Sequence, residues 1–408
     1  MSDLIGFISI FLISLFVFIL SFRTPAISKF LILALFIRVF LILFGYYVSP
    51  LPDSGADAIT FERDAWKLAE GGFMKLMNSF TGPSPHFISW LIGIPYSLVG
   101  RSVLMAQSIS LFFGICSIYL AWLLAKEIWG DQIAIKVGWT IAVFPSVTLY
   151  SVLILREVYI VFFLLLALYG IASWIKTYSL KSIIISAIGF VGAVFFHGGL
   201  MVGALIFITI VGITSLIKIL ESFMNLKINF KFFIITFFFI LILQLYFSNQ
   251  LSVPYLGTFE DSINTSNIQN RTGIATRGTA SWPEWTTINS PIEILYKGPI
   301  RSLYLVFAPF PWDVNEIRHL IGMLDGFLYI YLSYLILCNI KVILDDPILR
   351  IFLLLFLTYI FVFGIGVGNF GTGIRHRSKF VIIMILLAAP YLKQFVFFKR
   401  VESHKKNI

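Results

Sequence analysis

Long apolar runs of about twenty residues follow one another along most of the chain, separated by short polar connections. A helix of this length crosses a bilayer, so such runs indicate membrane spans. The pattern predicts about eleven spans. Their approximate limits are 4–21, 28–49, 102–124, 133–152, 155–175, 181–196, 198–218, 230–247, 318–342, 348–368 and 379–397. We therefore predict an all-α fold, a polytopic membrane helical bundle that forms a single integral membrane domain over residues 1–408.

Two parts of the pattern are ambiguous. The run 86–99 is apolar but short and is bracketed by Pro85 and Pro95, which favours an interfacial or re-entrant piece. The run 181–218 is long enough for one extended helix, but His197 is followed by two glycines. Glycine pairs punctuate helices, so a turn at His197 is the favoured interpretation.

The first long polar connection, residues 50–101, is acidic near its start and is expected to hold an extracytoplasmic amphipathic helix followed by a juxtamembrane helix. Its first carboxylates are Asp53, Asp57, Glu62, Asp64 and Glu70. Asp57 heads an apolar stripe at helical spacing that continues through Phe61, whereas Glu62 is expected off that stripe. Asp57 is therefore a candidate base or ligand, and the alternative is a helix cap formed with Ser54.

Composition fits this class of protein. Apolar residues make up 59% of the chain, charged residues only 12%, and there are 43 phenylalanines. A water-soluble chain of 408 residues does not have this balance, so soluble classes are excluded. Cys116 and Cys338 both lie in apolar runs, which predicts packing residues rather than a disulfide or a metal site.

The net charge of +10 is explained by membrane topology. If the connection at 22–29 is cytoplasmic, just over half of the 30 lysines and arginines share its side, on short connections and the carboxy-terminal tail. The carboxy terminus is then cytoplasmic, and the connections 50–101 and 248–317 are extracytoplasmic. No nucleic-acid partner is needed to account for the charge.

The second long connection, residues 248–317, holds turn-like basic segments and two tryptophans. Arg271 and Arg277 lie in the basic segments, and Trp282 and Trp285 follow shortly after. Indole rings suit a sugar face, and they equally suit the belt where membrane meets water. The hypothesis from these residues is a sugar or acceptor site.

The predicted topology brings ionisable groups from distant parts of the chain to the outer face. They are Asp53, Asp57, Arg101, Arg156, Glu157, His197, Arg375, His376, Arg377 and Lys379. Charged groups at membrane depth are expensive and usually mark a site. Simpler readings exist: Arg101 and Arg156 can extend to headgroups, Glu157 suits a helix N-terminus, and a lone His197 is more often a packing residue.

The chemistry of this set favours glycosyl transfer from a lipid-linked donor. Asp57, Glu157 and Asp53 are the candidate catalytic carboxylates, which suit activation of a hydroxyl. The cationic side chains suit the donor phosphate: Arg375, Arg377, His376, Lys379, Arg156 and Arg101. His197, with the aromatic and basic residues of 248–317, is expected at the sugar or acceptor. The residues predict no metal site, although a divalent metal stays open.

Residues 57–156 resemble the amino-terminal half of the GT-C membrane glycosyltransferases, which use polyprenyl-linked sugars. The resemblance rests on Asp57 before an amphipathic helix, an apolar juxtamembrane piece ending at Gly100, Arg101 opening the next span, and Glu157 opening a later one. It implies a GT-C-like fold, with Asp57 as catalytic base or acceptor-orienting carboxylate and Glu157 as a second acid. The chain also resembles O-antigen repeat-unit polymerases, whose donors are undecaprenyl-diphosphate glycans.

The sequence therefore predicts a glycosyltransferase of a bacterial-type inner membrane, active at the extracytoplasmic face in surface polysaccharide assembly. Its partners would be a polyprenyl-linked donor, a glycan or lipid-linked glycan acceptor, and membrane lipid. Single-sugar transfer and repeat-unit polymerisation stay open. The alternative is a transporter or flippase of lipid-linked glycans, which would predict two related halves and charges along a central pathway.

Overall fold

The computed structural model describes residues 2–224, 229–250, 252, 257, 281–314 and 317–393. Helices form almost all of the regular structure there, and no strand occurs among these residues, although Ser281 and Asn369 form an isolated bridge. The all-α prediction is confirmed for this part of the chain. Arg271 and Arg277 lie outside the described residues.

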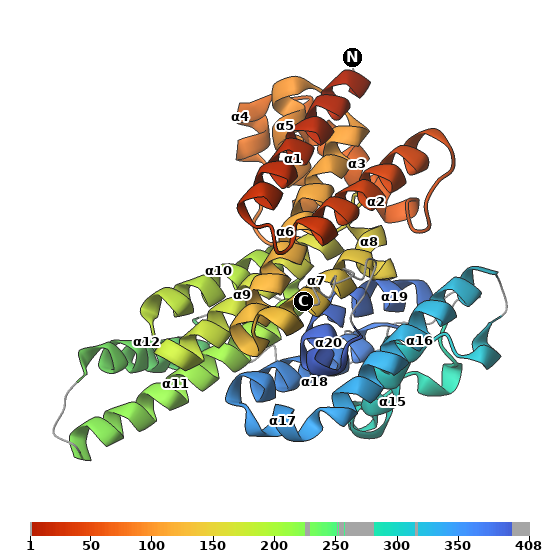
Figure 1. Cartoon of the computed structure of the whole chain (residues 1–408). Coiled ribbons are helices and arrows are strands. Elements are labelled where there is room, and N and C mark those ends of the chain that lie inside the picture. Colours follow the sequence, from red (N-terminus) through yellow and green to blue (C-terminus); the bar gives the residue numbers. More distant parts are fainter. Residues whose placement is uncertain are drawn as a thin grey trace, which may run out of the picture.

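The amino-terminal half supplies the helices at the top and centre of Figure 1. They are α1 (Ser2–Arg23), α2 (Ser28–Tyr47), α3 (Ala56–Ala69), α4 (Phe73–Asn78), α5 (Phe87–Val99), α6 (Val103–Trp129), α7 (Asp131–Val143), α8 (Pro145–Tyr150) and α9 (Glu157–Thr177). Helix α6 packs against α1, α7 and α9, and so connects the top of the molecule to its centre. Helices α3 and α5 pack on each other beside it.

The remaining helices form two groups that extend to opposite sides in Figure 1. The first group is α10 (Leu180–Phe196), η1 (Gly198–Leu200), α11 (Met201–Met224) and α12 (Phe230–Phe247). The second group is η2 (Glu284–Thr286), η3 (Pro291–Glu293), α15 (Ile294–Phe307), η4 (Pro311–Asp313), α16 (Ile317–Cys338), α17 (Ile340–Asp345), α18 (Pro347–Gly366), α19 (Phe370–Ser378), α20 (Val381–Ala388) and η5 (Ala389–Tyr391).

Length and apolarity allow many of these helices to cross a membrane. Among the described residues, seven helices are both long enough and apolar enough for a span: α1, α2, α6, α9, α11 with η1, α12 and α18. Shorter apolar helices cover Phe87–Val99, Leu180–Phe196, Gly322–Cys338 and Val381–Tyr391. These features are those of a multi-pass helical membrane protein. The predicted turn at His197 is confirmed, because α10 ends at Phe196 and η1 follows.

The span predicted over 133–152 is wrong as a single helix. Helix α7 ends at Val143, and Phe144 has an extended backbone before Pro145 begins α8. The ring of a proline disfavours the helical conformation of the residue before it. The break frees the Ala142 carbonyl, which accepts a hydrogen bond from Arg38 Nη1 at 2.8 Å.

Arg38 is fully buried inside the bundle, and its hydrogen-bond partners are uncharged oxygens. Its Nε donates to the Ser151 hydroxyl at 2.7 Å, and Nη1 also reaches the Ala34 carbonyl. Arg38 thus stabilises the junction of α2, α7 and α8 by satisfying backbone and hydroxyl oxygens within a buried region.

The segment predicted as a loop over 248–317 contains helix α15, which the sequence analysis missed. Helix α15 packs on α18, where Gly364 permits close approach: a Cβ there would lie 2.9 Å from the Ser302 Cα. Arg301 is buried and donates to the carbonyls of Thr286, Gly364, Ile365 and Val367. These bonds satisfy carbonyls where the chain leaves helical structure.

Candidate functional site

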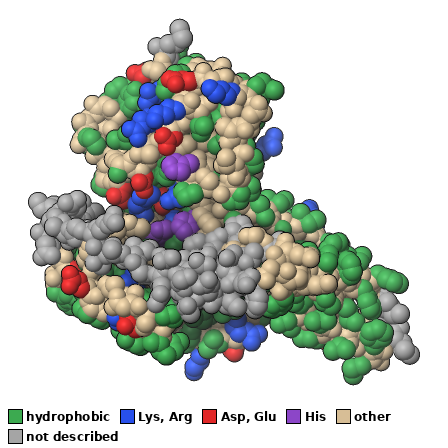
Figure 2. Space-filling model, turned by 180° about the vertical axis from the view of Figure 1, so that it is seen from behind, with side chains coloured by type: hydrophobic (Ala, Val, Ile, Leu, Met, Phe, Trp, Pro, Cys, Tyr) green, Lys and Arg blue, Asp and Glu red, His purple; other side chains and the backbone are tan. Residues whose placement is uncertain are grey.

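Charged and histidine side chains from separate parts of the sequence meet at the centre of the molecule. We call this group the polar cluster; its members are Asp53, Asp57, Tyr150, Arg156, Glu157, His197, Arg375, His376 and Lys379. They come from the α2–α3 connection, the starts of α3 and α9, α8, the α10–η1 turn and α19. From behind, Figure 2 shows such side chains gathered between the upper and lower parts of the molecule.

Glu157 lies at the centre of the polar cluster. It occupies the first turn of α9, where the helix dipole favours a carboxylate, and its side chain is only 2% exposed. Its Oε1 lies 3.5 Å from Arg375 Nη2 and 3.5 Å from Lys379 Nζ. A buried carboxylate needs such cationic partners, because isolation from water strongly penalises its charge.

Arg375 joins the buried centre to the more exposed carboxylate Asp57. Arg375 Nη1 donates to Asp57 Oδ2 at 2.6 Å, and the Asp57 side chain is 51% exposed. Burial alone would lower the pKa of Arg375, but the charges of Glu157 and Asp57 outweigh burial and raise it. The arginine therefore stays charged and presents its guanidinium between two carboxylates.

Lys379 and two histidines extend the polar cluster on its buried side. Lys379 Nζ lies 2.8 Å from His376 Nδ1, and the rings of His376 and His197 meet edge to face with centroids 5.2 Å apart. Burial, followed by the charge of Lys379, lowers the pKa of both histidines well below the ordinary value. Both are thus neutral near pH 7. Burial also lowers the pKa of Lys379, to about 7, against the opposing effect of Glu157.

Asp53 stands beside the same group with a partner that the sequence analysis did not identify. Tyr150 in α8 donates to Asp53 Oδ2 at 2.7 Å. Asp53 has a positive φ of 60°, a conformation that aspartate tolerates better than most residues in turns. In the sequence, Tyr150 lies near the end of the predicted span 133–152, which does not distinguish it from the other tyrosines near span ends.

Three buried polar atoms in the polar cluster have no hydrogen-bond partner. They are Arg156 Nε, Glu157 Oε2 and Arg375 Nε. Arg156 has other contacts: its Nη1 donates to the Phe196 carbonyl at 3.4 Å, and its guanidinium lies over the Phe61 ring. Native structures satisfy nearly all buried polar groups, so unpartnered atoms among charges indicate a place for a polar ligand or for water.

Arg101 was expected in the same group, but the structure gives it a different partner. It forms a two-point contact with Glu62, with distances of 2.9 and 2.6 Å, and Tyr96 also donates to Glu62. Glu62 is buried, so the expectation that it lies off the apolar side of α3 is wrong. The contact holds α3 against the start of α6, and Arg101 is occupied there.

The helix over Asp57 is confirmed, but the capping alternative for Asp57 is not. Helix α3 begins at Ala56, and its N-cap Gly55 makes no side-chain capping bond. Phe61 and Ala65 are buried as expected, whereas Asp57 lies on the exposed edge. Its carboxylate is bound by Arg375 rather than by its own helix.

Arg377 does not fit the expected contact with a donor phosphate. It is 1% exposed, and its nitrogens donate to Asp325 and to the carbonyls of Val306, Ala308 and Gly322. Its guanidinium also lies 4.7 Å from the centre of the Tyr329 ring. Although Arg377 is two residues from Arg375 on α19, it points to α15 and α16 and ties these helices together.

The two tryptophans, Trp282 and Trp285, differ in how accessible their rings are. Trp282 is buried with Arg301 over its ring and Tyr304 beside it, so it does not offer a face to a sugar. Trp285 remains 58% exposed, and its ring meets the edge of Tyr304. Trp285 therefore keeps an accessible surface, which the sequence could not distinguish from the buried indole three residues earlier.

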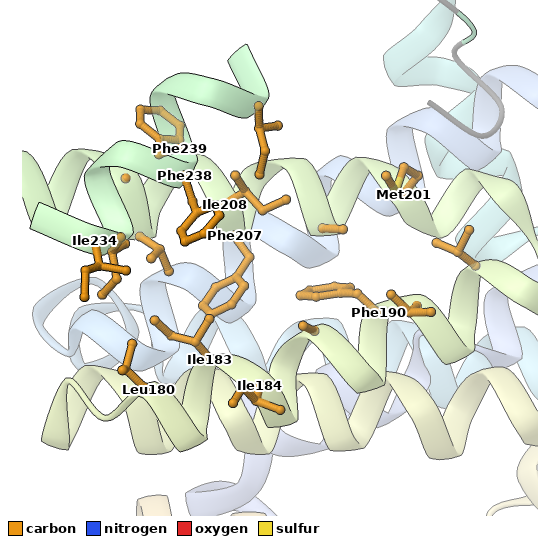
Figure 3. Close-up of a pocket in the computed structure, with 18 of the residues that line it drawn as sticks. Leu180, Ile183, Ile184, Phe190, Met201, Phe207, Ile208, Ile234, Phe238 and Phe239 are labelled. Atoms are coloured by element: carbon orange, nitrogen blue, oxygen red, sulfur yellow. The ribbon is translucent and has the colours of Figure 1, made fainter. Parts of the chain in front are cut away.

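An apolar cavity lies between α10, α11 and α12, and two of its lining residues flank the turn that carries His197. Its volume is about 560 Å³, and Figure 3 shows side chains from all three helices around it, with Leu180 and Ile234 at one end and Met201 at the other. Phe195 and Met201 line the cavity, and His197 lies between them in sequence. Arg156 binds the carbonyl of the intervening Phe196.

Within the part of the chain that the structure describes, no three histidine, cysteine, aspartate or glutamate side chains gather closely enough to hold a metal. Cys116 and Cys338 are both free thiols. No family model matches this chain, and no curated protein sequence matches it significantly.

Proposed function

We propose that this protein is an integral-membrane glycosyltransferase that takes a sugar or oligosaccharide from a polyprenyl-linked donor. The observation that carries the proposal is the polar cluster, in which His197 lies on the turn between Phe195 and Met201, two residues that line the apolar cavity. A lipid-linked donor has an apolar chain, a phosphate or diphosphate and a sugar. The cavity, the cationic side chains and the carboxylates offer one matching environment for each part.

The cavity suits the lipid part of the donor because apolar side chains from three helices line it. A chain that leaves the bilayer core loses little free energy if it enters such a lining. The phosphate would then lie beyond Met201, near His197, where Arg156 and Arg375 hold buried Nε atoms without partners. Phosphate oxygens are strong acceptors for guanidinium groups.

Asp57 is the proposed general base. Its exposure lets an acceptor hydroxyl approach, while its partner Arg375 lies where the leaving phosphate would be. Asp57 would take the hydroxyl proton as the oxygen attacks the anomeric carbon. The bond between that carbon and the phosphate oxygen breaks, and the electron pair stays on the phosphate, beside Arg375 and Arg156. Glu157 would position these cations from the buried side.

The proposed location is a bacterial-type inner membrane, with the site extracytoplasmic and the carboxy terminus cytoplasmic. The distribution of basic residues supports this orientation. Glu284, before α15, and Lys341, in α17, are both exposed and would face opposite sides. In intact cells, a membrane-impermeant maleimide should label Glu284→Cys and not Lys341→Cys, in a chain without Cys116 and Cys338. The reverse labelling would overturn the orientation.

Transfer is tested with purified protein, synthetic undecaprenyl-linked sugars and glycan acceptors. We expect a new glycosidic bond and one released lipid phosphate or diphosphate per transfer. Addition of one sugar indicates a single-sugar transferase, and chain growth indicates a repeat-unit polymerase for surface polysaccharide. Movement of the lipid-linked glycan across vesicles without a new bond would instead identify a flippase.

The critical variant is Asp57→Asn, which keeps the size of the side chain. Loss of a general base commonly slows a reaction by about 10²–10⁴-fold, and we expect a loss of that order with the protein still folded. Asp64→Asn is the matched control on the same helix, because Asp64 pairs with His86 away from the polar cluster. Equal transfer by both variants would remove Asp57 from the mechanism.

A further inference from the structure

The pair of Asp57 and Arg375 has an unequal environment at its two ends. Asp57 is 51% exposed, whereas Arg375 is 16% exposed and also approaches the buried Glu157. The two residues are 318 positions apart and belong to different helices, α3 and α19. The accessible Asp57 carboxylate therefore contacts one side of the Arg375 guanidinium, whose other side faces the buried Glu157.

Helix α3 does not depend on this pair for its position. Phe61 and Ala65 are buried, and Glu62 makes three hydrogen bonds with Arg101 and Tyr96. An ion pair with one half-exposed partner contributes little to stability. The Asp57 side chain can thus turn away from Arg375 while the rest of α3 stays packed.

Guanidinium donors remain available around this contact. Arg375 Nε and Arg156 Nε are both buried without a partner, and Lys379 lies on the far side of Glu157. A phosphate brings up to two charges and several acceptor oxygens, whereas Asp57 brings one charge and contacts a single nitrogen closely. A phosphate that reaches Arg375 competes directly with the Asp57 carboxylate.

We propose that Asp57 is an internal competitor for the anion site at Arg375, and that the phosphate of the donor displaces it. The displaced carboxylate becomes free to accept a proton. Donor binding thus releases the Asp57 carboxylate to act as the base. When no donor is bound, Asp57 stays paired with Arg375. The identity of the anion rests on the proposed function; the exchange itself rests on the geometry of Asp57, Arg375 and Arg156.

The test measures binding of undecaprenyl phosphate, which carries no sugar, to purified protein in detergent. Removing the competing charge in Asp57→Asn should tighten binding by about two- to fivefold, the range expected for one accessible ion pair. Asp64→Asn should bind as the unchanged protein does. Arg375→Gln should weaken binding, and thermal unfolding confirms that each variant is folded. Asp57→Ser serves as a second variant without the charge.

Binding and transfer then separate the two proposals. Tighter binding with lost transfer supports both the exchange and the role of Asp57 as base. Tighter binding with normal transfer supports the exchange and refutes the base. Unchanged or weaker binding by folded Asp57→Asn and Asp57→Ser overturns the exchange, whatever happens to transfer. Failure of the unchanged protein to bind the lipid phosphate overturns it as well.

Discussion

Two sets of buried arginines in this protein look alike in sequence and differ in their surroundings. Arg301 and Arg377 use every guanidinium nitrogen on carbonyls or a carboxylate of neighbouring segments. Arg156 and Arg375 each keep a buried Nε without a partner. The first set stabilises the bundle, and the second has capacity for a ligand.

The comparison shows that a buried charge alone does not locate a site. A guanidinium whose donors are all satisfied contributes to folding, because its removal leaves several acceptors unpaired. A guanidinium in the polar cluster with an unpartnered donor carries a cost that a bound anion would relieve. Arg38 also has a buried Nη2 without a partner, but it lies among uncharged oxygens and outside the polar cluster. Arg375 and Arg377 show this difference at two positions of one short helix, α19.

The largest expected effect tests the satisfied set. Arg377→Ala leaves Asp325 buried without its cation, together with the freed carbonyls of Val306, Ala308 and Gly322. Loss of one partner of a buried ion pair destabilises by about 3–5 kcal/mol. Thermal unfolding of the purified protein should show a large loss of stability or no folded protein. A normal melting curve would place Arg377 with the unsatisfied set.

An intermediate effect is expected in the cavity. Ala187 lines it and is exposed, so Ala187→Trp fills space without disturbing buried packing. Displacing about two methylene groups of a lipid chain costs roughly 1.6 kcal/mol, or about tenfold in affinity for an undecaprenyl donor. The affinity for a donor with a short lipid chain should stay unchanged.

Ile188→Trp is the matched control for the cavity variant. Ile188 is the next residue on α10 and is 53% exposed, but it is not among the residues that line the cavity. It adds the same indole to the outer surface. Equal affinities for the long-chain donor in the two variants would mean that the cavity does not hold the lipid.

The smallest effect is expected for the stability of Asp57→Asn. The exposed end of the ion pair with Arg375 contributes no more than about 1 kcal/mol, since water screens it. Denaturant unfolding should therefore give nearly the same free energy as for the unchanged protein. A loss as large as that of Arg377→Ala would show that this pair holds the fold together.

The order of the spans could be predicted because it depends on local properties of the chain. Apolar runs long enough for a bilayer gave the positions of most helices, and two glycines after His197 gave the turn between α10 and α11. The same topology grouped Asp57, Glu157 and Arg375 on one face, and the structure brings these three together.

Other features depend on packing between distant segments, which periodicity does not encode. At the helix break before Pro145, the Ala142 carbonyl accepts a hydrogen bond from Arg38, which lies more than a hundred residues earlier in the chain. Helix α15 was missed because Lys297, Pro299 and Arg301 interrupt its apolar pattern, and the partners of Arg301 come from η2 and the end of α18.

The sequence by itself determined that this chain is a helical membrane protein, because hydrophobic length acts residue by residue. Only the tertiary structure decided which of its buried charges are satisfied. Arg377 and Arg101 found partners in Asp325 and Glu62, whereas Arg375 kept a free donor beside Asp57. Whether a buried polar group finds a hydrogen-bond partner depends on the distances between segments that are remote in sequence, and only the folded chain sets these distances.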